Sequence, residues 1–264
     1  MQPLLEVPAS PDVRREFKRA SWRITIAPDF EEMSRAAAAF LLAAIRAKPD
    51  SLLCLPSGAS PVRVFELLVE AHCQDPHLFA RLRVIKLDEW GGLEMDDPAS
   101  CETYLRQRFL QPVGIGPDRY FGWHSHPKNP SEECDRVAAW LAKHGPIDLC
   151  LLGIGINGHL GLNEPALSLR PEPHVAQLTE ESAGHGMLAH ARRQPEYGLT
   201  LGMADLLHSR QVVLLASGES KAPQIERLGW GEVFTDCPAS FLWLHPAVAL
   251  FADEAAMSRA PAFR

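Results

Sequence analysis

Residues 147–165 read IDLCLLGIGINGHLGLNEP, an apolar run that breaks into four glycines, with His159 among them and Glu164 five residues later. The run is hydrophobic on both faces, which predicts a buried strand of a sheet covered on both sides. So many glycines are unfavourable unless the backbone approaches a ligand closely or takes positive φ, so they indicate a functional loop. The alternative interpretation, a core histidine bonded to a main-chain carbonyl, explains the glycines less well. An imidazole beside a carboxylate is suited to proton transfer, because the carboxylate fixes the tautomer and stabilises the imidazolium. The stretch therefore predicts a core strand that leads directly into a functional loop.

Short apolar runs alternate with amphipathic stretches of helical length on both sides of this segment. The alternation is typical of βαβ units and predicts a mainly parallel sheet, with functional loops at the carboxyl ends of its strands. Three helices have cap or proline signals at their first residues. The expected strands are 22–27, 52–55, 82–87, 147–152 and 212–216, and the expected helices are 29–46, 60–72 and 129–145.

Length, charge and cysteine spacing exclude several classes of protein. The chain has 264 residues, 26 Lys plus Arg, 33 Asp plus Glu and a formal net charge of -7, opposite in sign to a typical nucleic-acid binder. The longest apolar run, residues 36–45, is shorter than the roughly 20 residues of a membrane span. The six cysteines show no metal-ligand spacing, and the N-terminal residues lack the order of a secretory signal, so we expect a cytoplasmic protein. No Gly/Ser/Pro-rich linker divides residues 1–264, which we interpret as one domain.

Two loops between a strand and a helix start have the composition of an anion site. Residues 55–61, LPSGASP, offer free backbone N–H groups and a helix dipole, and residues 217–221, SGESK, repeat this pattern with a lysine. Neither loop is a Walker A or GxGxxG motif, so nucleotide binding gains no support. Each loop alone is compatible with an empty tight turn or a solvated lysine, but the two together indicate a phosphorylated small molecule. The candidate contacts are Ser57, Gly58, Ala59, Ser60 and Lys221.

Asp88 and Glu89 follow the apolar run VIKL at residues 84–87. A partly desolvated carboxylate at the end of a strand has a raised pKa and suits a general base. A turn acid that caps a neighbouring amide is the alternative interpretation. Adjacent residues point apart, so we expect at most one of the two to face a substrate.

Residues 170–197 are polar, follow no period and contain Pro, Gly and two histidines. A lid or excursion from the main sheet and a poorly patterned helix with a long loop are both compatible with this composition.

These segments, taken together, resemble the glucosamine-6-phosphate deaminase family. Residues 101–103 and 238–245 are similar to its galactosamine-6-phosphate isomerase (deaminating) branch, whereas relatives that hydrolyse 6-phosphogluconolactone usually lack the Asn-Glu-Pro found at 163–165. The resemblance implies a Rossmann-like three-layer αβα sandwich. It also implies conversion of a 2-amino-2-deoxyhexose 6-phosphate to a ketohexose 6-phosphate and ammonia, without cofactor or metal.

The resemblance also implies roles for individual residues. His159, assisted by Glu164, matches the group that opens the sugar ring, and Asp88 matches the carboxylate that moves a proton from carbon 2 to carbon 1. The implied substrate and phosphate contacts are Ser57, Gly58, Ala59, Ser60, Lys221, Glu89, Gly155 and Gly158.

The chain departs from the family pattern at two points. Asn157 stands where the family has an aspartate, and an amide cannot supply the charge that raises imidazole basicity. No arginine lies within 179–190, where the family has a phosphate ligand, and Arg192, Arg193 or His185 are its candidate replacements. A lactonase of the same fold and a sugar-phosphate-binding protein with weakened catalysis therefore stay open as alternatives. The sequence specifies neither the preference at carbon 4 nor a homo-oligomeric state.

Overall fold

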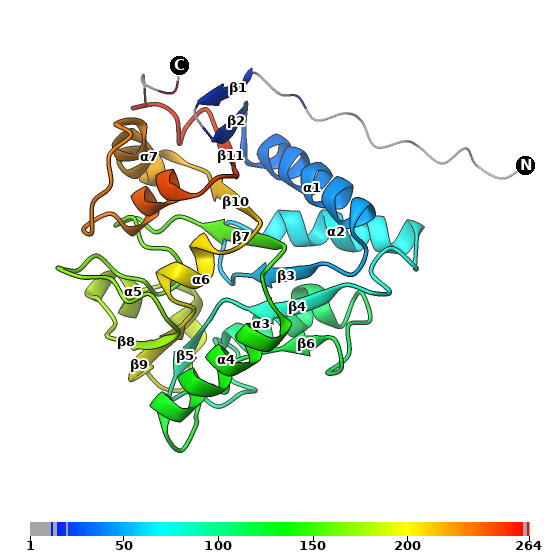
Figure 1. Ribbon diagram of the computed structural model, residues 1–264, viewed down its shortest axis with the longest axis vertical. Helices are drawn as coiled ribbons and strands as arrows, with labels where there is room; N and C mark the ends of the chain where they lie inside the picture. The colour runs from blue at the N-terminus through cyan, green and yellow to red at the C-terminus, as the bar shows by residue number, and fades with distance from the viewer. Residues whose placement is uncertain (1–11, 13–14, 20, 261–262, 264) are drawn as a thin grey trace, which may run out of the picture.

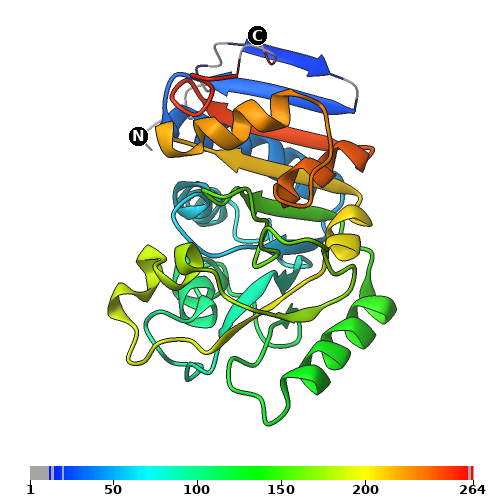
Figure 2. The ribbon, with the colours of Figure 1, turned by 90° about the vertical axis from the view of Figure 1, so that its left-hand side faces the viewer.

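The computed structural model describes residues 12, 15–19, 21–260 and 263, and it contains an eight-stranded sheet with helices on both faces (Figure 1). The strand order is β1-β2-β11-β10-β7-β3-β4-β6, and all neighbouring pairs are parallel except β1 and β2. Figure 2 shows the strands stacked edge to edge, with β1 at the top. The strands are β1 (Arg15–Arg19), β2 (Trp22–Ala27), β3 (Leu52–Leu55), β4 (Arg83–Lys86), β6 (Tyr120–Phe121), β7 (Leu149–Gly153), β10 (Gln211–Ala216) and β11 (Val248–Asp253).

The two faces of the sheet build two separate hydrophobic clusters, because successive side chains of a strand point to opposite sides. In β3, Leu53 and Leu55 pack with helices α1 and α2, whereas Leu52 and Cys54 pack with α4, α6 and α7. This is the three-layer arrangement expected from the sequence, and the α/β fold class is confirmed. The helices are α1 (Phe30–Ala47), α2 (Val62–Gln74), α3 (Cys101–Leu105), α4 (Pro130–His144), α5 (Glu180–Ala183), α6 (Met203–Leu207) and α7 (Ala222–Gly229), with shorter or irregular turns η1 (Arg106–Leu110), η2 (Gly186–His190), η3 (Glu219–Lys221) and η4 (Pro238–Leu244).

The helix starts follow the expected chemistry in two of three cases. Asp29 accepts a hydrogen bond from the amide of Glu32, and Asn129 accepts one from Ser131, so both are true N-caps. Ser60 does not cap α2, which begins at Val62 behind Pro61 without a side-chain cap. The expected strands are present within two residues of the predicted ends. The interior strand β11 and the strands β1 and β6 at the two edges of the sheet were not predicted.

Residues 170–197 are an excursion that carries its own small sheet. Strands β8 (His174–Ala176) and β9 (Tyr197–Thr200) pair antiparallel, and β9 also pairs with β5 (Asp88–Gly91). Helix α5 and turn η2 lie between β8 and β9. The excursion interpretation is therefore confirmed, and the alternative of one poorly patterned helix is wrong.

The parallel strands deliver four loops to one edge of the sheet. Strands β3, β4, β7 and β10 are neighbours or near neighbours, and each is followed by one of the segments selected from the sequence. The chain runs outward from β3 to β4 and β6 and then returns to β7 on the other side of β3. Such a reversal leaves a crevice at the carboxyl ends of the strands, which is where open α/β sheets bind ligands. The interpretation of the chain as one domain stays a prediction.

Candidate active site

A cavity of about 650 Å³ opens at the carboxyl ends of the strands. Its walls come from the loops after β3, β4, β7 and β10 and from the excursion. The volume suits a ligand of hexose phosphate size, since small-molecule sites measure roughly 300–1,000 Å³. Of the sequence-predicted residues, Ser57, Gly58, Ala59, Ser60, Asp88, Gly155, His159 and Lys221 line it.

Asp88 is the first residue of β5 and presents a nearly buried carboxylate to the cavity, 8% exposed. Its Oδ1 atom makes no hydrogen bond to the described residues. The pKa of Asp88 is raised to about 7: burial is the largest cause and the neighbouring Glu89 carboxylate adds to it, whereas Lys86 lowers the pKa. A carboxyl group of this pKa is able to accept and return a proton near neutral pH.

His159 lies across the cavity, on the glycine-rich loop after β7. A Cβ atom on Gly155 would lie 2.5 Å from the His159 ring, so only glycine lets the imidazole lie against this backbone. His159 Nδ1 lies 3.5 Å from Glu164 Oε2, within ion-pair range but without the alignment of a hydrogen bond. The two side chains thus form the pair that the sequence predicted.

Glu164 lies behind His159 and does not line the cavity. Asn157 Nδ2 donates to Glu164 Oε2 at 3.0 Å, Ser182 Oγ donates to Oε1, and Thr179 Oγ1 donates to Oε2 at 3.4 Å. Burial tends to raise the pKa of Glu164, but the His159 imidazole and the bonds from Ser182 and Asn157 outweigh it, so the pKa is lowered. Glu164 is therefore held as a carboxylate that supports the imidazole.

The loop after β3 has the free donors of an anion site. The amides of residues 57–60 donate no hydrogen bond to other described residues, and Gly58 adopts φ 105°. Helix α3 and its surroundings support the loop: Tyr104 Oη donates to Gly58 O at 2.6 Å, and Ser57 Oγ donates to Cys101 Sγ at 3.1 Å. Such a row of unpaired N–H groups before a helix favours a phosphate.

The loop after β10 contributes a cation to the cavity. The Gly218 amide is already bonded to Asp253, which also accepts from Ser217. Lys221 reaches the cavity, and burial lowers the pKa of its ammonium group. A bound phosphate dianion would compensate that desolvated charge.

His185 is the candidate replacement that faces the cavity. Its ring lies 3.8 Å from the position of a Cβ on Gly58, and Trp90 contacts it from the side with ring centroids 5.8 Å apart. Burial lowers the pKa of His185, and the nearby His159 and Lys221 add to this effect. Arg192 pairs with Asp96 and Arg193 with Glu196, and neither lines the cavity.

Glu89 and Gly158 do not line the cavity, although both were expected to contact substrate. Glu89 is fully buried and points away from Asp88 into a separate polar cluster, because neighbours on an extended strand face opposite sides. Gly158, at φ 89°, packs against Cys237 and Gln224, where a Cβ would lie 2.9 Å from the sulfur. Sequence analysis also missed Thr179 and Ser182, because the excursion has no periodic signal.

The described residues contain no group of three or more His, Cys, Asp or Glu side chains arranged to hold a metal ion. No helix in the described part of the chain combines the length and apolar composition of a membrane span.

Comparison with known families agrees with this geometry. A family model described as glucosamine-6-phosphate isomerases/6-phosphogluconolactonase matches residues 28–249. The chain belongs to this family. The family indicated by the sequence motifs is thus confirmed, and the matched range contains all four loops of the cavity.

Several members of the family are similar along most of the chain. A protein of Escherichia coli strain K12 named AgaI, with a provisional assignment as a deaminase, is 43% identical over 217 residues, 82% of this chain and 86% of that protein. The glucosamine-6-phosphate deaminase of Rhodopirellula baltica is 39% identical and covers 89% of this chain and 94% of its own length. A solved structure of a monomeric glucosamine-6-phosphate deaminase superposes with a TM-score of 0.85 at 34% identity, over 89% of this chain and 99% of that one.

The lactonase side of the family is more distant. The 6-phosphogluconolactonase of Trypanosoma brucei superposes with a TM-score of 0.70 at 18% identity, over 89% of this chain and 97% of that one. That likeness shows the shared fold alone.

Proposed function

We propose that this chain converts galactosamine 6-phosphate, in preference to glucosamine 6-phosphate, to the corresponding ketohexose 6-phosphate and ammonia. The general class, an isomerase/deaminase enzyme, is confirmed by the deaminases among its relatives. One observation carries the mechanism: Asp88 and His159 face the same cavity as Lys221 and the free amides of residues 57–60. We further propose that the enzyme acts in the cytoplasm, where reducing conditions suit its six free cysteines.

Ring opening is the step assigned to His159. The imidazolium donates a proton to the ring oxygen, the bond between that oxygen and carbon 1 breaks, and the neutral imidazole then accepts the proton that the anomeric hydroxyl loses. Glu164, kept ionised by Ser182 and Asn157, stabilises the imidazolium form of His159 before the transfer. The product is the open-chain 2-amino aldehyde.

Isomerisation is the step assigned to Asp88. Its carboxylate removes the proton from carbon 2, next to the aldehyde, and the aldehyde oxygen takes up a proton, which gives a 1,2-enolamine. Asp88 then returns its proton to carbon 1 while the nitrogen loses one, which yields an imine at carbon 2. Water then adds to the imine and ammonia leaves, so the overall reaction consumes one water molecule. Asp88 lines the cavity, so its carboxylate can approach carbon 1 and carbon 2 of a bound sugar.

Ammonia release separates this proposal from the alternatives. Purified protein is assayed with galactosamine 6-phosphate, glucosamine 6-phosphate and 6-phosphogluconolactone, with ammonia and lactone consumption measured in parallel. We expect ammonia from both amino sugars and a higher kcat/KM for the galactose epimer. Lactone hydrolysis without ammonia would assign the chain to the lactonase side, and tight sugar-phosphate binding without any turnover would assign it to the binding proteins.

Lys221→Met is expected to weaken substrate binding more than it slows the chemistry. The change removes a desolvated cation from the cavity, and a hydrogen bond to a charged group contributes about 1.5–3 kcal/mol. KM should therefore rise roughly 10- to 150-fold, with a smaller change in kcat. Inhibition by inorganic phosphate should weaken in parallel, and an unchanged KM would contradict the assignment. Lys143→Met, a lysine in the last turn of α4, is the matched control.

Asn157→Asp is expected to lower kcat rather than raise it. Asn157 donates a hydrogen bond to Glu164, and an aspartate would replace that donor with a like charge. Loss of about 1 kcal/mol corresponds to a decrease of roughly fivefold. Steady-state kinetics at fixed pH provide the measurement. A clear gain in kcat would instead show that the asparagine weakens catalysis in the natural chain.

A further inference from the structure

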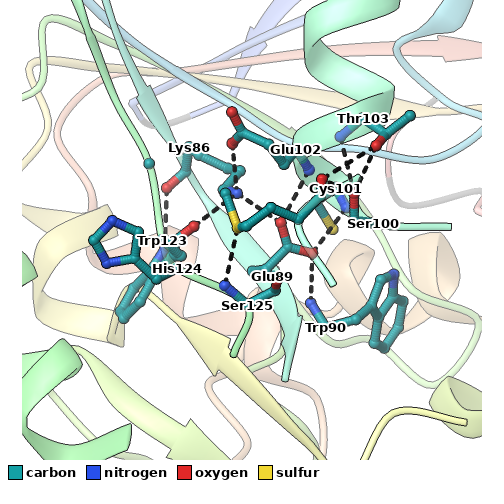
Figure 3. A network of polar contacts seen from close by, with 12 residues as sticks. Lys86, Glu89, Trp90, Ser100, Cys101, Glu102, Thr103, Trp123, His124 and Ser125 are labelled. Carbon is teal, nitrogen blue, oxygen red and sulfur yellow. Dashed lines mark hydrogen bonds and ion pairs between the residues drawn. The ribbon is translucent and has the colours of Figure 1, made fainter. Parts of the chain in front are cut away.

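A buried charge cluster, formed by Lys86, Glu89 and Glu102, lies next to the proposed base Asp88. Figure 3 shows the side chains of this cluster. Lys86, the last residue of β4, is fully buried, and its ammonium group donates to Glu89 Oε2 at 2.6 Å, to Glu102 Oε2 at 2.8 Å and to Trp123 O at 3.0 Å. All three N–H donors of the lysine are therefore occupied. A lysine at this depth is rare and needs such complete pairing.

The two carboxylates of the cluster are equally well satisfied. Glu89 accepts the amides of Trp90, Cys101 and Glu102 in addition to Lys86. Glu102 also accepts the Tyr120 hydroxyl at 2.6 Å and pairs with Arg106 at 2.6 Å. The cluster thereby joins β4, β5 and β6 to the first turn of α3. Two cations balance two carboxylates, so the charge of Glu89 is compensated only while Lys86 is present.

The position of Asp88 ties this cluster to the chemistry. Asp88 comes two residues after Lys86 and one before Glu89, yet it alone of the three lines the cavity. The ionisable groups next to it are Lys86 of β4, Glu89 of β5, Cys101 of α3 and Cys54 of β3. His159, His185 and Lys221 face the same cavity from other loops. Lys86 is the only cation among the groups next to Asp88 in the described part of the chain.

We propose that Lys86 is a positioning residue for the proton transfer: with Glu89 it forms a fixed, fully buried charge pair next to Asp88 that holds this carboxylate in the state able to take the proton from carbon 2. The proposal rests on the proposed function, because it assigns the tuning of that same base. The two charges act on Asp88 in the directions that this proposal requires, since Glu89 raises the pKa of Asp88 and Lys86 lowers it. Lys86 touches no reacting atom and acts through Asp88 alone.

The test uses the acidic limb of the kcat profile, which reports the pKa of the base in the enzyme–substrate complex. In Lys86→Met the uncompensated Glu89 charge should move this limb up by about one pH unit, and in Glu89→Gln the limb should move down by a similar amount, since a nearby charge moves a carboxyl pKa by about this much. Lys86→Met should consequently lose activity at neutral pH and regain much of it in alkaline buffer. Two substitutions in one cluster that move the limb in opposite directions distinguish charge tuning from structural damage.

Glu102→Gln is the matched control. It removes a carboxylate bonded to the same Lys86 ammonium group but leaves the Lys86–Glu89 pair intact, so its limb should move less than in either other variant. The double variant Lys86→Met/Glu89→Gln removes both charges and should return the limb toward its original position. The thermal unfolding midpoints of the double variant and of Lys86→Met are also compared. A higher midpoint in the double variant would show that the unpaired charge of Glu89 destabilises Lys86→Met.

The proposal would be overturned if the acidic limb of the kcat profile keeps its pH in folded Lys86→Met and Glu89→Gln, or if it moves in the same direction in both variants. Titration of the Asp88 carboxyl carbon by ¹³C NMR, assigned with Asp88→Asn, gives the same comparison without turnover. If the natural chain releases no ammonia, the proposed function fails, while the NMR shifts still decide whether Lys86 and Glu89 tune Asp88. The two failures are therefore distinguishable.

Discussion

Asp88→Asn is expected to lower kcat for ammonia release by roughly 10²- to 10⁴-fold, the range that a positioned general base contributes. Asparagine has nearly the same shape but cannot accept the proton from carbon 2. The substitution breaks no hydrogen bond at Oδ1, which has no partner, so the fold and the phosphate site should persist. KM and the thermal unfolding midpoint are measured in parallel as controls. A kcat within tenfold of the natural chain would remove Asp88 from the role of base.

The pH dependence of the natural chain tests the same assignment. Asp88 must be ionised to act as a base, and burial raises its pKa to about 7. We therefore expect kcat to fall as the pH drops through about 7, because the carboxyl group becomes protonated. Residual activity of Asp88→Asn should lack this limb.

His159→Gln is the second substitution with a large expected effect, a decrease of roughly 10²-fold or more in ammonia release. Glutamine retains polar atoms near the cavity but cannot exchange a proton with the ring oxygen. The space created by Gly155 holds a side chain of this size, so the loop should keep its conformation. The measurement is kcat with the cyclic amino-sugar phosphate.

Isotope exchange separates the two roles. When ketohexose 6-phosphate and ammonium are incubated with enzyme in D₂O, deuterium enters at carbon 1 through the base alone, before any aldose ring closes. We expect His159→Gln to keep much of this exchange, followed by ¹H NMR, while Asp88→Asn loses it. Equal loss of exchange in both variants would contradict the division of labour between the two residues.

The loops after β3 and β7 that line the cavity were predictable because their signals are local. A strand followed by small residues and a helix start has free amides whatever surrounds it, and residues 57–60 keep those amides unpaired. Glycines carrying a histidine point to close backbone approach, and Gly155 shows it against the His159 ring. The unbroken apolar run of β3, Leu52–Leu55, also indicated that both faces of the sheet are covered, because successive side chains point to opposite faces.

Tertiary structure alone decided which of two adjacent carboxylates faces the cavity. Asp88 and Glu89 look alike in the sequence, and their assignment depends on Lys86, Glu102 and the amides of α3, which come together only when β4, β5 and α3 pack. Two other features also depend on how residues 170–197 fold back over the sheet. His185 lines the cavity, whereas Arg192 and Arg193 do not. Thr179 and Ser182 donate hydrogen bonds to Glu164. Periodicity and turn chemistry act between near neighbours in the chain, whereas these partners are set by long-range packing, which no local pattern encodes.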